Sequence, residues 1–143
     1  MSYSGKYKPK NYKKYRGDPT KIYYRSLWER RFMDYCDRNP KIIEWGSEEI
    51  VIPYISPIDK KAHRYFPDFY IKMVDANGQS IRHIIEVKPK KYLKPPQKKS
   101  RTTQKFIREI ATYGINQAKF KAARRYCKDR KYLFTILTED HLT

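Results

Sequence analysis

The sequence predicts a single α/β domain in which a mixed β-sheet is flanked by helices. Three observations support this fold class: a segment with helical periodicity near the N-terminus, three strand-like segments after it, and a long helix followed by a last strand. The predicted order is therefore αβββαβ. A chain of 143 residues has room for one such domain.

Residues 1–23 are predicted to form a basic N-terminal arm, and residues 24–143 the folded domain. The arm interleaves tyrosines with lysines and has no apolar period. Its cations would meet phosphates and its tyrosines would stack on bases, although a solvated, mobile arm explains the composition equally well. The cations singled out as nucleic-acid contacts are Lys13, Lys14 and Arg16.

The first helix is predicted over residues 26–38. Ser26 is a good N-cap, and Asn39-Pro40 ends the segment. The apolar residues that fall on one helical face are Trp28, Phe32, Tyr35 and Cys36. Ser26 and Glu29 have capping-box spacing, which explains Glu29 as a structural residue, while a reach toward a metal ion is the alternative.

Three strands are expected next. The first lies in residues 41–54, the second over 64–74 and the third over 81–88, and Asp75-Ala76-Asn77-Gly78 forms a hairpin turn between the last two. The register of this hairpin decides which side chains meet, because neighbours along a strand point to opposite faces.

A two-residue loop would pair residue 68 with 87, whereas a three-residue loop would place residue 68 opposite 86 or 88. The apolar alternates of the two strands occupy odd positions, among them Phe69, Ile71 and Ile85. They must share a buried face, so the loop must be of odd length. Asp68, Glu86 and Lys88 are therefore expected to converge on the other face.

A basic, proline-rich loop over residues 89–101 follows, then a helix over 102–128 and a strand over 131–138. The loop would supply a phosphate-binding rim of Lys90, Lys91, Lys94, Lys98, Lys99 and Arg101. Gln117 interrupts the apolar stripe of the helix, and it either reaches the active site or is an ordinary half-buried amide.

Composition points to a polyanionic partner. Lys and Arg number 33 against 15 Asp and Glu, a formal net charge of +18, and nucleic acid is the leading candidate. No apolar stretch is long enough to span a membrane, and no cysteine–histidine spacing predicts a zinc site. Cys36 and Cys127 fit a reduced, intracellular protein.

Two carboxylates on neighbouring strands repel each other unless a cation lies between them. Carboxylate oxygens suit Mg²⁺, which polarises a phosphoryl oxygen and acidifies water. Lys88 would orient that water or neutralise charge in the transition state. The alternative is a surface salt bridge. However, Ile84 and Ile85 indicate that the strand leading to Glu86 is central and buried, where charged side chains are costly unless they have a function.

The order of these motifs resembles the PD-(D/E)xK nuclease superfamily, with its restriction-endonuclease-like core. The residues that carry the resemblance are Ser26-x-x-Glu29, Pro67-Asp68 and Glu86-Val87-Lys88. The helix-borne glutamate is similar to the TnsA-type transposon endonuclease branch. Over its full length, including the opening MSYSGKYKPKNYKKYRGDPTKIYYRSLWERRF, the chain is similar to head-completion nucleases of T-even-type tailed phages.

The resemblance implies an endonuclease that cuts double-stranded DNA with Mg²⁺, for which Mn²⁺ would substitute. Asp68, Glu86 and the Val87 carbonyl would bind the metal ion, Lys88 would be the catalytic lysine, and Glu29 would be an active-site acid. Gln117 would correspond loosely to a helix residue near the site.

Such a protein would act in the host cytoplasm, and in the virion head, beside phage head or portal-associated proteins. Two other functions stay open: a structural DNA-binding or head-plugging protein that does not cut, and a repair-type endonuclease.

Overall fold

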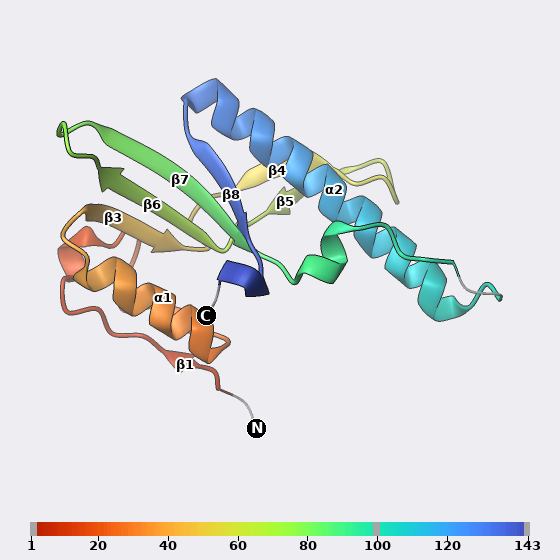
Figure 1. Cartoon of the computed structure of the whole chain (residues 1–143), viewed down its shortest axis with the longest axis horizontal. Coiled ribbons are helices and arrows are strands. Elements are labelled where there is room, and N and C mark those ends of the chain that lie inside the picture. Colours follow the sequence, from red (N-terminus) through yellow and green to blue (C-terminus); the bar gives the residue numbers. More distant parts are fainter. Residues whose placement is uncertain (1–2, 99–100, 142–143) are drawn as a thin grey trace.

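The computed structural model describes residues 3–98 and 101–141 and has the predicted α/β architecture (Figure 1). The central sheet has the strand order β3-β6-β7-β8, with the first three strands antiparallel and β8 parallel to β7. Its strands are β3 (Ile42–Ser47), β6 (Phe69–Val74), β7 (Ser80–Val87) and β8 (Leu133–Leu137).

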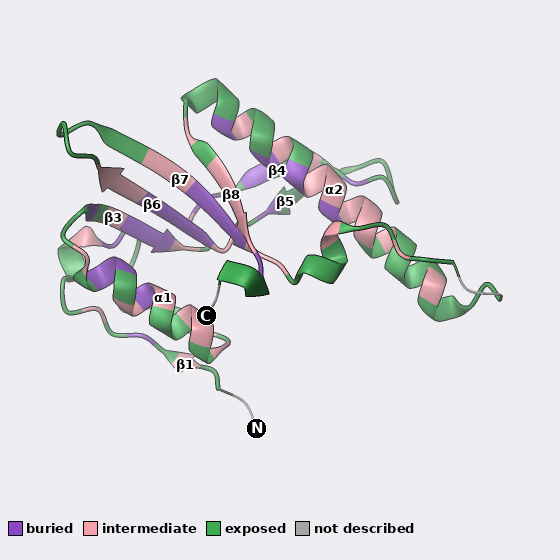
Figure 2. Cartoon of the chain, viewed as in Figure 1, coloured by how far each residue is buried: buried purple, intermediate pink, exposed green. Residues whose placement is uncertain are grey.

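One helix covers each face of this sheet. Helix α1 (Leu27–Arg38) packs with odd-numbered residues of β6 and β7, including Phe69 and Ile85. Helix α2 (Gln104–Arg130) packs with even-numbered residues of the same strands, Tyr70 and Ile84. Because side chains alternate along a strand, both faces are buried, and Figure 2 shows β6 and β7 buried toward one end.

The helix ends follow the expected chemistry. The Ser26 hydroxyl oxygen accepts a hydrogen bond from the Glu29 N–H at 3.1 Å, which confirms the predicted N-cap. Helix α2 begins with Thr103 as its cap and ends at Lys131, whose backbone is left-handed. Neither helix in the described ranges is both long and apolar enough to cross a membrane.

Two predicted strands are each divided in two, which corrects the sequence-based prediction. The first becomes β3 and β4 (Ile52–Ile55), and the second becomes β5 (Ala62–Tyr65) and β6. Strands β4 and β5 form a separate hairpin beside α2. The second division falls at Pro67, which has no N–H to donate to a ladder.

The hairpin register agrees with the odd-length loop. Phe69 lies opposite Ile85 and Val74 opposite Ser80, so the register continues to Asp75–Gln79 at the turn and to Asp68–Glu86 at the other end. The Asp75 N–H donates to the Gln79 carbonyl at 2.8 Å. Gly78 has a φ of +79°, which favours glycine in this turn.

The segment predicted as an arm is packed against the domain, which is a second correction. It contains β1 (Gly5–Lys6), a 3₁₀ turn (Tyr12–Lys14) and β2 (Tyr23–Tyr24). Tyr7, Tyr15 and Ile22 are buried in the α1 side of the core. The rings of Tyr7 and Tyr15 both pack edge-on against Trp45 of the edge strand β3.

Asp37 at the end of α1 anchors this segment. Its carboxylate accepts hydrogen bonds from the backbone N–H groups of Lys10 and Asn11 at 2.9 and 3.1 Å, and Asp37 is only 1% exposed. The Lys14 ammonium donates to the carbonyls of Cys36, Asp37 and Asn39 at 2.8–3.0 Å. These carbonyls lie at the helix C-terminus, where a cation is stabilising.

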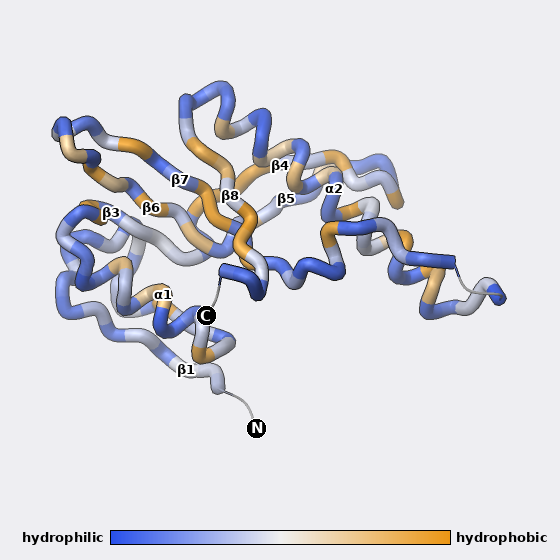
Figure 3. The backbone as a smooth tube through the Cα atoms, viewed as in Figure 1, coloured by the Kyte–Doolittle hydropathy of each residue, from blue (hydrophilic) through white to orange (hydrophobic). Residues whose placement is uncertain are grey.

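Hydropathy follows this layering. Apolar residues gather along the sheet, while the connection from β7 to α2 is mostly hydrophilic (Figure 3). That connection includes a 3₁₀ turn, η2 (Lys90–Leu93), within the stretch predicted to be a loop without helix. A last 3₁₀ turn, η3 (Glu139–His141), follows β8.

Candidate active site

Two backbone hydrogen bonds hold Asp68 and Glu86 side by side. The Val87 N–H donates to Asp68 Oδ2 at 2.7 Å, and the Asp68 N–H donates to Glu86 Oε1 at 3.3 Å. Each carboxylate thus accepts from the partner strand, which fixes the orientation of both. The convergence predicted from the loop length is present in the structure.

Lys88 extends this pair at the end of β7. Its ammonium lies 3.7 Å from Glu86 Oε2, and its side chain is 25% exposed against 9% for Glu86. The Lys88 N–H donates to the Leu137 carbonyl of β8 at 2.9 Å, so the neighbouring strand holds its backbone. The ammonium can therefore face an incoming phosphate while its Cα stays fixed.

Both carboxyl groups of the pair have raised pKa values, as expected where too little positive charge is present to stabilise the two carboxylates. Burial, and next the Asp68 charge, raises the pKa of Glu86 to about 7 although Lys88 opposes the shift. Burial also raises the pKa of Asp68, which the Val87 N–H and Lys88 only partly offset. A cation between the carboxylates would relieve both effects.

Glu29 and Glu48 bring further acidic groups toward Asp68. Burial, and secondly the Asp68 charge, raises the pKa of Glu29, so the N-terminus of α1 lies within electrostatic reach of the pair. The Glu48 N–H donates to the Asp68 carbonyl at 3.1 Å. Glu48 also forms an ion pair with Arg25 at 2.6 Å and has a φ of +55°. Neither Arg25 nor Glu48 has a sequence signal that would have identified it.

Tyr65 is a buried neighbour that sequence patterns also did not identify. Its hydroxyl has no hydrogen-bond partner among the described residues, and the tyrosine is 3% exposed. Burial, and next the charge of Glu86, raises the pKa of Tyr65. The hydroxyl lies near enough to Glu86 for the two side chains to interact, so a small movement of either would give the hydroxyl a partner.

The donor set fits a hard divalent cation. In the described ranges no three His, Cys, Asp or Glu side chains converge, so the candidate protein donors are the two carboxylates and the expected Val87 carbonyl. Mg²⁺ needs only one or two carboxylates, because it keeps several waters as ligands. The raised pKa values of Asp68 and Glu86 are consistent with a site adapted to hold such an ion.

The strained pair gives a stability prediction. The folded-state pKa of Glu86 exceeds its ordinary value of 4.5, so the folded protein binds a proton that the unfolded chain has released, and stability falls between pH 4.5 and about 7. Asp68→Asn removes one charge and keeps an oxygen for Val87. Without divalent ions at pH 8, we expect it to raise the unfolding free energy by on the order of 1 kcal/mol.

Urea denaturation in chelator at pH 5 and pH 8 measures this difference. The gain should shrink at pH 5, where wild-type Glu86 is protonated. An Asp68→Asn protein less stable than wild type at pH 8 would contradict mutual repulsion in the pair.

The basic residues predicted to bind DNA have different environments. Lys91 and Lys94 line a cavity beside Lys88, and Lys98, Arg101 and Lys13 are exposed. Lys99 lies outside the described residues. Three others have partners within the protein: Lys90 pairs with Asp140 at 3.0 Å, Arg16 lies over the Tyr70 ring, and Lys14 binds the end of α1. For Lys14 this structural use replaces the predicted DNA contact.

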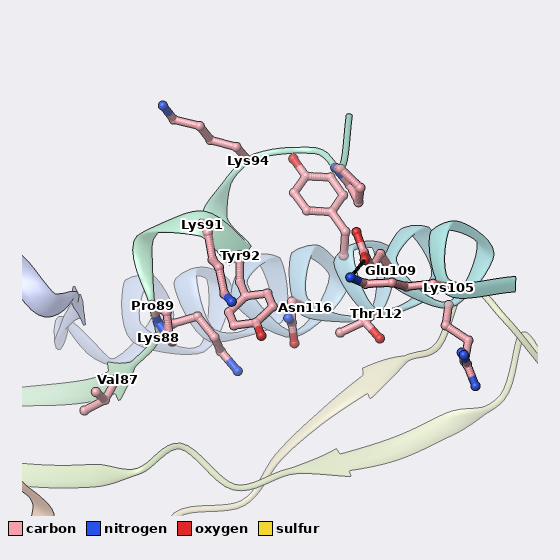
Figure 4. Close-up of a pocket in the computed structure, with 13 residues that line it drawn as sticks. Val87, Lys88, Pro89, Lys91, Tyr92, Lys94, Lys105, Glu109, Thr112 and Asn116 are labelled. Carbon is pink, nitrogen blue, oxygen red and sulfur yellow. Dashed lines mark ion pairs between the residues drawn. The ribbon is translucent and has the colours of Figure 1, made fainter. Parts of the chain in front are cut away.

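On α2, Asn116 lines the cavity beside Lys88, and the predicted Gln117 is the next residue, whose role stays a prediction. Asn116 lines the cavity that begins at Val87 and Lys88, whereas Gln117 is half-buried and does not line it (Figure 4). The apolar periodicity of the helix indicated a polar residue in this turn. Periodicity alone did not show which of the neighbouring positions, 116 or 117, would line the cavity.

A second basic hollow of about 610 Å³ lies on the other side of α1. Segments far apart in the sequence supply its cations, so no single basic run indicated it. They are Lys6, Lys8, Lys10, Arg30, Arg31 and Arg38.

Comparison with known proteins gives two matches. Residues 39–139 match the model of the family described as TnsA-like endonuclease N terminal. The chain is also 49% identical over 146 residues to the protein named "Head completion nuclease" of Enterobacteria phage T4, covering 99% of this chain and 95% of that protein. No solved structure matches. The family match includes Asp68 and Glu86 but begins after Glu29.

Proposed function

The chain belongs to the TnsA-like endonuclease N-terminal family, and from that premise we propose that it is a metal-dependent endonuclease that hydrolyses phosphodiester bonds of double-stranded DNA. The observation that carries the proposal is the pair of buried carboxylates, Asp68 and Glu86, fixed side by side with Lys88 next to them. A structural ion pair would not need a second buried carboxylate that destabilises the first.

Asp68, Glu86 and the Val87 carbonyl would hold Mg²⁺, and Mn²⁺ would substitute. When bound, this ion supplies Lewis-acid polarisation of the phosphoryl oxygens and a more acidic water. The protein fixes the two carboxylates through the Val87 and Asp68 N–H groups before substrate arrives. This pre-organisation means that little reorientation is needed as charge develops in the reaction.

Lys88 would stabilise charge on the scissile phosphate or orient the attacking water. Its partial exposure and its 3.7 Å distance from Glu86 leave the ammonium free to turn toward a phosphate. Glu29 would add an acidic group from α1, and its raised pKa supports a position near the pair. Gln117 would act from α2, next to Asn116.

DNA would bind mainly through phosphates, because the charge is +18 and no base-reading motif is present in the sequence. The cations proposed as contacts are Lys13, Arg16, Lys90, Lys91, Lys94, Lys98, Lys99 and Arg101. Binding should therefore weaken steeply as salt is raised.

The biological setting is proposed from the relative's name. A protein this similar to a head completion nuclease would act during assembly of a phage head, on packaged DNA or its end. It would work in the host cytoplasm, remain with the virion head, and contact other head or portal-associated proteins.

Lys88→Met is expected to lower the cleavage rate about 10²–10³-fold, because it removes the cation nearest the scissile phosphate. DNA affinity should change little, since 32 other Lys and Arg residues remain of the 33. Single-turnover cleavage and gel shift measure the two effects. Lys128→Met is the matched control, since Lys128 is exposed near the end of α2 and is not among the proposed DNA contacts. Equal loss in both variants would contradict a specific role for Lys88.

The test of the proposed function is cleavage of supercoiled plasmid and linear duplex DNA by the purified chain, in chelator and in Mg²⁺ or Mn²⁺. Cutting only with the divalent ion is the expected result. Tight DNA binding without cutting under any of these conditions would support a structural head-plugging protein instead.

A further inference from the structure

A cavity of about 710 Å³ begins at Val87 and Lys88 and runs between η2 and the first half of α2 (Figure 4). We call it the Tyr92 pocket, after the aromatic residue that η2 places on its wall. Its volume is in the range of pockets that hold small organic ligands. Because Lys88 belongs to both the pocket and the candidate active site, an occupant would lie directly beside the bond to be cut.

The walls of the Tyr92 pocket are strongly basic. Three elements contribute cations, namely Lys88, Lys91, Lys94, Lys105 and Arg108. The acidic residue on the wall, Glu109, lies 3.9 Å from Lys105 and is neutralised by it. This excess of positive charge selects an anionic occupant, such as a phosphodiester.

The pocket also has groups that suit a flat heterocycle. Tyr92 is 43% exposed, and Tyr113 lines the pocket from α2. Asn116 is 6% exposed overall and lines the pocket from α2. Its side-chain amide offers both a donor and an acceptor, as the edge of a base requires.

We propose that the Tyr92 pocket holds an unpaired nucleotide next to the scissile phosphate. Its base would stack on Tyr92 or Tyr113 and hydrogen-bond to Asn116, while Lys91 and Lys94 bind its phosphate. This inference rests on the proposed nuclease function and adds a substrate class: DNA with a single-stranded extension or frayed end. A base inside a continuous duplex is stacked and paired, so it does not enter such a pocket.

Binding of cleavage-silent Asp68→Asn protein to two DNAs tests the proposal. One is a blunt duplex. The other is the same duplex with a short single-stranded extension, which is prepared in one version at the 3′ end and in another at the 5′ end. We expect about tenfold tighter binding of an extended duplex, from stacking of one base. Adding Tyr92→Leu or Asn116→Leu should bring the affinity ratio close to one, whereas Tyr23→Leu, at an exposed tyrosine on β2, should leave it unchanged.

Photocrosslinking locates the base. A 5-iodouracil in the extension is expected to crosslink to Tyr92 or Tyr113, and the same base inside the duplex is not. Equal affinity for blunt and extended duplexes, or crosslinks only outside the pocket, would overturn the proposal. Because binding is measured without cleavage, these outcomes are separate from failure of the proposed function, which is a wild-type protein that cuts no DNA.

Discussion

Glu86→Gln is expected to lower the DNA cleavage rate by at least about 10³-fold while the protein remains folded and binds DNA. The amide has the size of the carboxylate and keeps an oxygen for the Asp68 N–H, so the backbone pairing that orients the site survives. What is lost is one of the two negative charges available to a divalent cation. Folding should not suffer, because the change also removes the repulsion that raises the pKa of Glu86.

Single-turnover cleavage, gel shift and thermal melting of the same protein sample measure the three parts of this prediction. Asp59→Asn is the matched control, since Asp59 is an exposed acid paired with His63 on the β4–β5 hairpin. It should cut at the wild-type rate. A Glu86→Gln protein that still cuts within about tenfold of wild type would remove Glu86 from the active site.

Asp37→Ala is expected to lower the unfolding free energy by about 3 kcal/mol, the largest effect on stability that we predict. The change leaves the N–H groups of Lys10 and Asn11 without their acceptor. It also removes the negative charge that favours the protonated Lys14 ammonium, although the Lys14 hydrogen bond to the Asp37 backbone carbonyl remains. The N-terminal segment should then detach from α1 and β3, exposing Trp45.

Urea denaturation gives the free energy, and limited proteolysis near residues 8–14 reports detachment. Asp129→Ala, at an exposed aspartate near the end of α2, is the control. A surface substitution of this kind should cost below about 1 kcal/mol. Equal losses in the two variants would contradict the role assigned to Asp37.

Local patterns were sufficient to predict the part of the fold that carries the site. The odd-numbered apolar residues of two strands required an odd-length loop, and this placed Asp68, Glu86 and Lys88 on one face. The structure has Phe69 opposite Ile85, as that argument requires. The even face is buried as well, under α2, which the alternation alone did not predict.

The packing of the N-terminal segment could not be predicted from the sequence, because it depends on contacts between residues far apart in the chain. The N-terminal segment contains no apolar period because its buried side chains are mostly tyrosines, which find edge-on packing on Trp45 and a hydroxyl contact at Ser47. Its main anchor, Asp37, lies 26–27 positions away in sequence. No periodicity within either segment reports such a pairing.

Parts of the site arise from the same kind of contact. Tyr65 reaches Glu86 because Pro67 ends one strand and starts another, so a strand predicted as continuous supplies residues to two sheets. Asn116 lines the cavity because of how α2 is rotated about its axis as it packs on the sheet. The spacing of apolar residues in the sequence does not define this rotation closely enough to distinguish position 116 from position 117.

Titration of the protein with Mn²⁺, followed by the electron paramagnetic resonance signal of the free ion, tests whether Asp68 and Glu86 form a metal site. We expect saturable uptake by wild type and binding at least about tenfold weaker in Asp68→Asn, with an Asp59→Asn control that binds as wild type does. Equal binding by all three proteins, or no binding by wild type, would contradict the assignment of Asp68 and Glu86 as a metal site.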